Sequence, residues 1–323
     1  MSQSGMIINV VRFEYLNEIN WAVVEGSMLR LIDRPYTTTA ELLDDKDSIL
    51  SLIKNKKGTL IPLSEVKLLS PVIGNRRVIC QGANYTQHMK ESGIDPDAKT
   101  YNMFFNKSSA SICSASDDIV KPKHVNLLDY EIELGLVIGK PIDREVEVTN
   151  DNLWQYVAAI VITNDVSARD VQIPETQFFK GKSYRTFCPV GPYLCLVDQH
   201  SIKYLNELEL TLSVNGEVRQ KDSTKNWIYK PAETLTELSS FSNLETGDLV
   251  LTGTPNGCAL RLPSPAVVKL FSLLPEAFRW KKFKQIQGKR TQYLKPGDEI
   301  NAVIKSADNN VHLGQQCNRI VSA

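Results

Sequence analysis

Three carboxylates share one short apolar stretch of the chain. In LDYEIELGLVIGK, residues 128–140, Asp129, Glu131 and Glu133 alternate with apolar side chains. Because successive strand residues point to opposite faces, we expect the three acids on one face of a largely buried strand. Like charges stacked on a strand face repel one another, and burying them without partners is costly. Such an arrangement calls for a compensating cation.

A further acid ends a second apolar stretch, VAAIVITNDVS, at Asp165. Mg²⁺ and similar hard cations prefer oxygen ligands and usually keep some positions for water or substrate. The Glu131–Glu133 pair alone could be a charged, exposed strand face, and Asp165 alone could be a turn or cap residue. Together the three acids favour a divalent metal site. Asp129 is interpreted as a strand-start carboxylate satisfied by solvent.

Bulk composition narrows the function classes. The chain has 323 residues, of which 42% are hydrophobic and 23% charged, as in ordinary globular proteins. Basic and acidic residues number 37 each, which gives no electrostatic case for nucleic-acid binding. We expect no secretory signal and no membrane span, since the apolar runs are too short to cross a bilayer. The six cysteines lack metal-type spacing, which favours reduced thiols in a cytoplasmic protein.

The elements that must position these acids fall into two regions. Residues 1–70 predict a small N-terminal α/β domain, with a hairpin turned at Glu25–Gly26 and a helix over 39–56. Residues 71–323 predict a larger α+β domain in which strands dominate and form a rolled or barrel-like mixed sheet. The Asn215–Gly216 pair within it indicates a second hairpin.

The segment from about 260 to 290 departs from the strand pattern. It predicts one or two helices interrupted by Pro275. Its second half carries six basic residues: Arg279, Lys281, Lys282, Lys284, Lys289 and Arg290. A solvated helix face is the simplest interpretation. A lid, an oligomer contact or a surface for an anionic partner is the alternative.

Six ordered motifs resemble those of the fumarylacetoacetate hydrolase family. They are GANYTQHMKE, MFFNKSSASI, LDYEIELGLVIG, TNDVSARDVQ, GKSYRTFCPVGP and LTGTPNG. The resemblance runs from about residue 71 to the end and is interrupted by the 260–290 insertion. It implies the family's β-roll catalytic domain, a variable N-terminal cap and a homodimer.

The resemblance also implies roles for individual residues. Glu131, Glu133 and Asp165 match the family's Mg²⁺ or Mn²⁺ ligands. The implied catalytic residues are His88 and Glu91, as a pair that activates water, and Lys182. The implied substrate-binding residues are Tyr85, Arg169, Gln172 and Thr254, and Phe105 and Lys107 lie in pocket-lining motifs. Arg185 departs from the family pattern, which has Asp at this position in many members.

These features predict an enzyme that acts on a small 2-oxo acid. The first hypothesis is a divalent-metal-dependent hydrolase that cleaves a C–C bond in an acylpyruvate- or fumarylacetoacetate-like substrate through a metal-stabilised enolate. An oxaloacetate decarboxylase or a 2-hydroxy-diene-dioate isomerase could use the same site. A third hypothesis is a non-enzymatic protein that binds a partner through the basic helical insertion.

Overall fold

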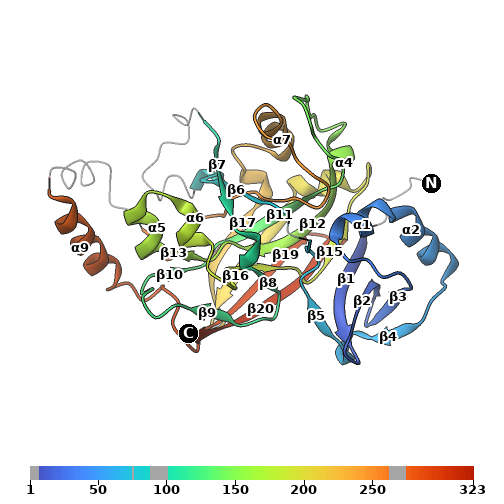
Figure 1. Cartoon of the computed structure of the whole chain (residues 1–323), viewed down its shortest axis with the longest axis horizontal. Coiled ribbons are helices and arrows are strands. Elements are labelled where there is room, and N and C mark those ends of the chain that lie inside the picture. The colour runs from blue at the N-terminus through green and yellow to red at the C-terminus, as the bar shows by residue number, and fades with distance from the viewer. Residues whose placement is uncertain (1–6, 75, 88–100, 262–273) are drawn as a thin grey trace.

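The structure, a computed structural model, describes residues 7–74, 76–87, 101–261 and 274–323. These residues form two large open sheets and several short helices (Figure 1). The helices are α1 (Thr39–Asp44), α2 (Lys46–Asn55), α4 (Leu153–Tyr156), α5 (Arg169–Glu175), α6 (Phe178–Lys182), α7 (Pro231–Ser239) and α9 (Glu276–Gln287). The expected α+β class is confirmed, and the described strands form open sheets rather than a closed barrel.

The larger sheet holds most of the strands. Its members are β1 (Ile8–Tyr15), β2 (Glu18–Glu25), β3 (Met28–Ile32), β4 (Leu60–Pro62), β5 (Lys67–Leu69), β6 (Val78–Gly82), β7 (Met103–Lys107), β8 (Ile112–Ser114), β11 (Ile132–Ile138), β12 (Val157–Asn164), β14 (Cys188–Val190), β15 (Leu194–Leu196) and β18 (Leu249–Leu251). Its main path runs β4-β3-β2-β1-β15-β12-β11-β18-β6-β7, with β5, β8 and β14 joined beside it.

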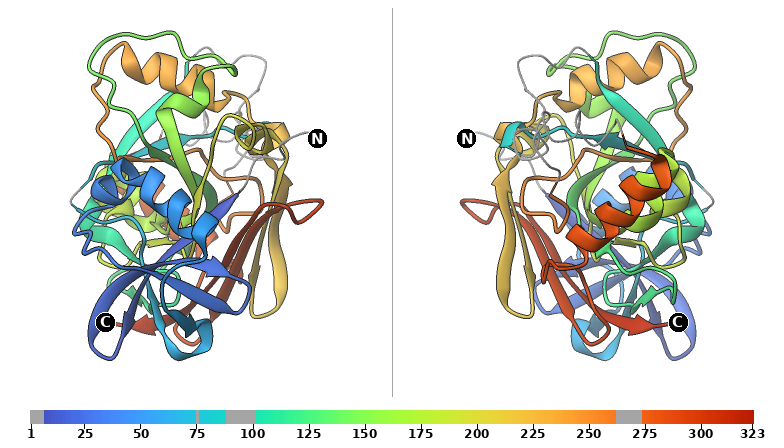
Figure 2. Two further views of the ribbon diagram at one scale, coloured as in Figure 1. Left: turned by 90° about the vertical axis from the view of Figure 1, so that its right-hand side faces the viewer. Right: turned by 90° about the vertical axis from the view of Figure 1, so that its left-hand side faces the viewer.

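The smaller sheet packs against the middle of the larger one (Figure 2). Its strands are β9 (Ile119–Lys121), β16 (Leu208–Val214), β17 (Glu217–Ser223), β19 (Glu299–Ser306) and β20 (His312–Ser322), in the order β17-β16-β19-β20-β9. A short pair, β10 (Leu128–Asp129) and β13 (Ser167–Ala168), lies apart from both sheets.

The apolar runs that the sequence singled out form the centre of the fold. Every residue of β11 is buried, and β12 is buried at all but one position. Covered on both faces, such strands need near-continuous apolar side chains, which explains their composition. Their antiparallel register pairs Ile132 with Asn164. That register places the residues just before β11 beside the residue that follows β12.

Local predictions met different outcomes. The hairpins at Glu25–Gly26 and Asn215–Gly216 are confirmed by the β2–β3 and β16–β17 pairings. The helix predicted over 39–56 is two helices, α1 and α2, divided at Asp45. Lys56, in the left-handed conformation, caps the end of α2, two residues before Gly58.

The N-terminal strands extend the larger sheet. β1 pairs antiparallel with β15, with Ile8 opposite Leu196 and Val10 opposite Leu194. Residues 1–70 thus contribute strands to the sheet that also contains β11 and β12. The division of the chain at residue 70 stays a prediction.

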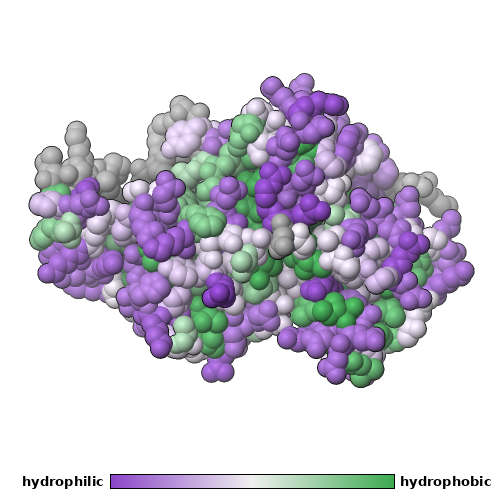
Figure 3. Space-filling view, in the orientation of Figure 1, coloured by the Kyte–Doolittle hydropathy of each residue, from purple (hydrophilic) through white to green (hydrophobic). Residues whose placement is uncertain are grey.

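Helix α9 lies at one end of the longest axis, opposite α1 and α2 (Figure 1). Pro275 immediately precedes it, and the other helical residues expected between 262 and 273 lie outside the described residues. The end formed by α9 is largely hydrophilic, whereas green apolar areas gather nearer the middle of the face in Figure 3. None of the helices in the described ranges is both long and apolar enough to span a bilayer.

Candidate active site

Three acids converge at the junction of β10, β11 and β12. One carboxylate oxygen each from Glu131, Glu133 and Asp165 lies within 4.8 Å of the others, and all three residues are buried. Glu133 belongs to β11, Glu131 precedes it, and Asp165 follows β12. The Asp165 N–H donates to the Glu131 carbonyl at 2.8 Å, which fixes the two segments side by side. The structure therefore shows the convergence that the sequence predicts.

Two buried lysines meet these acids. Lys182, at the end of α6, donates to Glu131 Oε2 at 2.6 Å and also to Asp165. Lys107, at the end of β7, donates to Asp165 Oδ1 at 2.5 Å and to the Val166 carbonyl at 3.2 Å. Charges removed from water must be paired, and removing one partner of a buried pair is strongly destabilising. Asp165 thus joins two elements that are far apart in the sequence.

Arg169 forms a fork at the start of α5. It donates to Asp129 Oδ2 at 2.8 Å, to Gln172 Oε1 at 2.8 Å, and to Glu131. Its planar guanidinium reaches these three acceptors from three separate nitrogens held in a fixed fork, whereas a lysine ammonium offers its donors from a single nitrogen. Arg169 and Gln172, both expected to bind substrate, therefore lie together beside the acids.

The interpretation of Asp129 as a solvent-satisfied residue is wrong. It is completely buried, and its carboxylate accepts hydrogen bonds from the backbone N–H groups of Ala259 at 2.7 Å and Leu260 at 3.0 Å as well as from Arg169. The 259–260 segment, distant in sequence, covers this end of β10. Asp129 therefore orients Arg169 and is not one of the three converging acids.

The cluster holds one more carboxylate than it has cations. Its four carboxylates and three cations are Asp129, Glu131, Glu133, Asp165, Lys107, Arg169 and Lys182. Burial raises the pKa of Glu133 well above its ordinary value, and the charges of Asp165 and Glu131 raise it further. Burial alone would lower the pKa of Lys182, but the same two acids hold it above its usual value. Lys182 is therefore protonated. The acids repel one another because the cluster contains fewer cations than carboxylates.

The donor set fits a hard divalent ion. The atoms that converge are carboxylate oxygens, the ligands that Mg²⁺ and Mn²⁺ prefer. Burial, and after it the charges of Asp165 and Glu131, raise the pKa of Glu133, and a positive charge beside it would favour its carboxylate form. A divalent cation would supply it. Glu131, Glu133 and Asp165 are the residues that would hold such an ion.

The turn after β18 fixes Glu133. The Gly253 N–H donates to Glu133 Oε2 at 2.7 Å. Gly253 has φ +85°, and a Cβ there would lie 2.8 Å from Asn84 Cβ, so this turn requires glycine. Asn84 in turn donates to the Thr252 carbonyl at 2.9 Å. The TGTPNG motif thus places a backbone donor on an acid of the cluster.

The Thr254 hydroxyl makes its hydrogen bonds within the protein. Its hydroxyl donates to the Ile132 carbonyl at 2.9 Å and accepts from Gln220 Nε2 at 2.9 Å. Gln220, from β17, also accepts from the Ile132 N–H at 3.0 Å. The contact between Thr254 and a substrate carboxylate, expected from the resemblance, stays a prediction. In the structure this threonine ties the smaller sheet to the start of β11.

The remaining predicted residues fall in different places. Tyr85 is fully buried at the end of the segment that follows β6. Arg185 is exposed. His88 and Glu91, the expected water-activating pair, lie outside the described residues.

Sequence reasoning missed the importance of two residues. Gln220 carried no signal, because its partners Ile132 and Thr254 come from distant segments. Lys107 lies in a recognised motif, but its contact with Asp165 depends on the order of strands in the sheet. The only local indication of a role for Lys107 is its position at the end of a mostly apolar strand, MFFNK.

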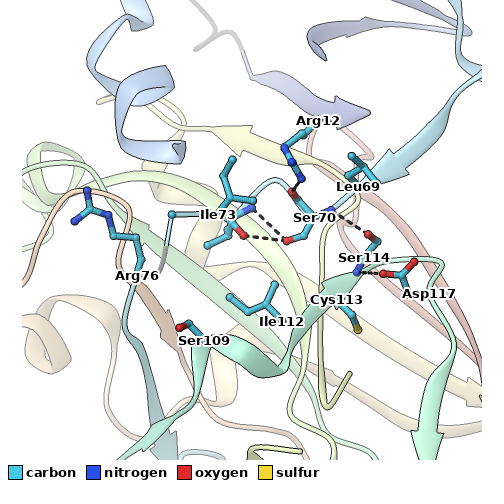
Figure 4. A pocket seen from close by; sticks show the side chains of 12 residues that line it. Arg12, Leu69, Ser70, Ile73, Arg76, Ser109, Ile112, Cys113, Ser114 and Asp117 are labelled. Atoms are coloured by element: carbon cyan, nitrogen blue, oxygen red, sulfur yellow. Dashed lines mark hydrogen bonds between the residues drawn. The ribbon is translucent and has the colours of Figure 1, made fainter. Parts of the chain in front are cut away.

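A separate cavity of about 320 Å³ lies where the N-terminal strands meet β8 (Figure 4). Arg12 reaches the Ser70 carbonyl across it, and the Ser70 N–H donates to Ser114 Oγ at 3.2 Å. The Ser114 N–H donates in turn to Asp117. The lining contains none of the three converging acids, so this cavity is distinct from the candidate site.

Comparison with known proteins follows the same residues. The family model described as fumarylacetoacetate (FAA) hydrolase C-terminal matches residues 77–321. Mitochondrial oxaloacetate tautomerase FAHD2A of Bos taurus is 34% identical over 237 residues, 72% of this chain and 73% of that protein. Oxaloacetate tautomerase YisK of Bacillus subtilis is 37% identical over 209 residues, 64% of this chain and 68% of that protein.

Solved structures agree over the whole length. A fumarylacetoacetate hydrolase from Exiguobacterium antarcticum is 29% identical, with a TM-score of 0.74 over 98% of this chain and 100% of that chain. A probable 2-hydroxyhepta-2,4-diene-1,7-dioate isomerase from Mycobacterium abscessus is 28% identical, with a TM-score of 0.71 over 98% and 99%. With the matched family region covering most of the sequence, and the ordered motifs placed around one buried acid cluster, the chain belongs to the fumarylacetoacetate hydrolase family.

Proposed function

We propose that this chain is a metal-dependent enzyme of 2-oxo acids and that its reaction is the keto–enol interconversion of oxaloacetate. One observation carries the proposal: Glu131, Glu133 and Asp165 converge within 4.8 Å. The relatives named oxaloacetate tautomerases support the choice of substrate.

The donor set suits Mg²⁺ or Mn²⁺. When bound, such an ion would supply Lewis-acid polarisation of the 2-oxo acid. Glu131, Glu133 and Asp165 would hold it. The choice between the two ions belongs to the proposal.

The chain's own cations account for charge stabilisation. In tautomerisation a proton leaves C3 as the C2–C3 double bond forms, and a proton is taken up at the C2 oxygen. Negative charge grows on that oxygen as the C3 proton leaves. Lys182 and Arg169 are fixed and charged beside the acids, so their positive charge needs no rearrangement to act there. His88 would serve as the base near neutral pH, where an ordinary histidine with a pKa of roughly 6.5 is effective.

C–C bond hydrolysis of an acylpyruvate is the second candidate. The similarity to the Exiguobacterium antarcticum fumarylacetoacetate hydrolase favours it. Hydrolysis needs a water activated by His88, with Glu91 orienting the histidine, whereas tautomerisation needs only proton transfer. Loss of carbon dioxide from oxaloacetate, or isomerisation of a 2-hydroxy-diene-dioate, would place charge on the same oxygen and use the same cations.

The decisive experiment follows the ultraviolet absorbance of enol-oxaloacetate with Mg²⁺, with Mn²⁺ and with EDTA. We expect metal-dependent acceleration of its decay to the keto form, without matching release of carbon dioxide. Parallel assays with an acylpyruvate test hydrolysis. Glu131→Gln should abolish turnover, whereas Asp143→Gln, at an exposed acid, should not. No metal-dependent turnover of either substrate would sink the proposal.

Assembly and location complete the proposal. We infer a homodimer in the cytoplasm, as the sequence led us to expect. All six cysteines are free thiols, which accords with a reducing compartment. Light scattering on the purified chain and localisation of the tagged full-length protein test the two inferences separately.

A further inference from the structure

Lys107 holds one oxygen of Asp165 and has no part in the proposed reaction. Its ammonium donates to Asp165 Oδ1 at 2.5 Å and to the Val166 carbonyl at 3.2 Å. Both side chains of this ion pair are 0% exposed. Lys107 is the last residue of β7, where it lies opposite Val78 of β6 in the larger sheet. Asp165 Oδ1 is therefore held by a buried cation that is itself anchored in a sheet.

The other two acids show the same arrangement. Glu131 Oε1 accepts from the guanidinium of Arg169, which Asp129 also binds. Glu133 Oε2 accepts from the Gly253 N–H at 2.7 Å. A lysine, an arginine and a backbone amide, from three separate segments of the chain, thus each hold one oxygen of a different acid.

The other oxygens of Glu131 and Asp165 point toward one place. Lys182 donates to Glu131 Oε2 at 2.6 Å and also to Asp165 Oδ2, so one ammonium group lies between these two oxygens. One oxygen from each of the three acids lies within 4.8 Å of the others. The site therefore offers a cation one oxygen from each acid rather than two.

The number of carboxylate oxygens on offer distinguishes Mg²⁺ from Ca²⁺. Mg²⁺ requires an octahedral shell, takes few protein oxygens and keeps water or substrate at the remaining positions. Ca²⁺ is larger, takes about six to eight oxygens and often binds both oxygens of one carboxylate. Asp165 could offer both of its oxygens only by giving up its contact with Lys107. That change would leave a buried ammonium without its partner, which is costly.

We propose that Lys107 is a positioning residue that determines metal selectivity: by holding Asp165 Oδ1, it limits Asp165 to one oxygen for the ion and so favours Mg²⁺ over Ca²⁺. The donors on the other two acids act in the same direction. Lys107 is the one to replace, because Arg169 belongs to the proposed catalytic machinery and Gly253 donates through its backbone. The inference rests on the proposed function, because it requires a divalent ion at the three acids.

The test compares the affinities of two ions for the full chain. Mg²⁺ and Ca²⁺ are titrated calorimetrically into the metal-depleted native chain and into Lys107→Met, which removes the charge and frees Asp165 Oδ1. The two ions carry the same charge, so general damage to the site affects both affinities and cancels in their ratio. We expect the native chain to bind Mg²⁺ at least about tenfold more tightly than Ca²⁺. Lys107→Met should lower this ratio roughly tenfold, which is at the low end for one contact to a charged group.

A milder variant and a matched control sharpen the result. Lys107→Gln keeps a hydrogen-bond donor but loses the charge, and it should lower the ratio by about threefold. This variant carries the comparison if Lys107→Met does not fold, which circular dichroism and urea unfolding show. Lys123→Met makes the same exchange at an exposed lysine and should leave both affinities unchanged.

Three outcomes would overturn the inference. They are a native chain that binds Ca²⁺ as tightly as Mg²⁺, a native chain that binds neither ion, and folded Lys107 variants in which both affinities change by the same factor. The last result would mean that Lys107 only supports the fold. Failure of the proposed function looks different. Mg²⁺ would then bind with a selectivity that depends on Lys107, while the native chain would turn over neither oxaloacetate nor an acylpyruvate.

Discussion

The acid cluster and helix α9 use the same kinds of side chain in opposite ways. Lys182 lies 5.1 Å from the centre of the Phe105 ring, is 2% exposed, and contacts two carboxylates. Lys282 lies 5.6 Å from the centre of the Phe278 ring on α9. No ion pair found within the described ranges involves a residue of α9.

The comparison of these two lysines shows how a charged residue of the candidate site can be distinguished from a solvated one. A lysine over an aromatic ring occurs in both places, so that contact does not distinguish them. Burial does, because a charge withdrawn from water must find partners, whereas a charge in water need not. The buried cluster is accordingly fixed in place. Of the six basic residues for which a solvated face was expected, Lys281, Lys284 and Lys289 are exposed, whereas Arg279, Lys282 and Arg290 are partly buried.

The largest expected effect comes from Asp165. Asp165→Asn keeps the shape but leaves Lys107 and Lys182 without their shared negative charge. We expect the free energy of unfolding to fall by about 3–5 kcal/mol and divalent-cation binding to be lost. Urea unfolding and Mn²⁺ titration measure the two effects. Asp151→Asn, at an exposed acid, is the control, and a loss below about 1 kcal/mol in Asp165→Asn would contradict the role of this pairing.

Arg169→Lys should have the next largest effect. Lysine keeps the charge but cannot reach Asp129, Glu131 and Gln172 together. We expect kcat/KM for oxaloacetate to fall roughly 100-fold, which corresponds to about 2–3 kcal/mol of lost charged hydrogen bonding. Arg279→Lys makes the same exchange on α9 and should leave kcat/KM unchanged. If the two variants changed kcat/KM by the same factor, the proposed difference between the acid cluster and α9 would be wrong.

Protonation of Glu133 should have a moderate effect on the free energy of unfolding, and the direction of its raised pKa fixes how that effect changes with pH. Its folded pKa is raised above the usual 4.5, so it favours folding of the metal-free chain at low pH. That contribution is full below the unfolded pKa and is lost as pH rises through the folded pKa, by at most about 1.4 kcal/mol per pH unit. A divalent cation needs the carboxylate, so its affinity should rise over the same interval.

Thermal unfolding with and without Mg²⁺, followed from about pH 5 to about pH 8, measures this effect. The difference in Tm should widen as pH rises, and Glu133→Gln should flatten it. Lys281→Gln on α9 should leave the curve unchanged. A difference that narrows toward high pH has the wrong sign for this mechanism.

The smallest effect is expected on α9. Replacing Lys281, Lys282 and Lys284 with glutamine removes charges that have no described ion-pair partner. The free energy of unfolding should change by less than about 0.5 kcal/mol, as for other solvated surface positions. Turnover of oxaloacetate should be unaffected. A fall of about tenfold would mean that this helix belongs to the site.

Local pattern predicted the parts of the site that lie on continuous strands. The apolar runs of β11 and β12 and the acids at their ends were visible in sequence because strand periodicity and buried composition are local properties. Glu131, Glu133 and Asp165 could therefore be grouped before their geometry was known. The hairpins followed from Gly26 and Gly216 for the same reason.

Contacts between segments that are far apart in the chain could not be predicted from the sequence. Asp129 is buried because Ala259 and Leu260 cover it, and no local signal announces a partner 130 residues away. Lys107 meets Asp165 only because β7 and β12 share one sheet. His88 and Glu91 remain predictions.

The pairing of β1 with β15 has a consequence for any shortened form of the protein. Removing the leading 70 residues would strip one side of β15 of its neighbour, β1. An uncovered strand edge recruits strands from other molecules. We therefore expect a catalytic fragment that begins near residue 71 to associate with other molecules through β15 unless a substitute strand covers that edge.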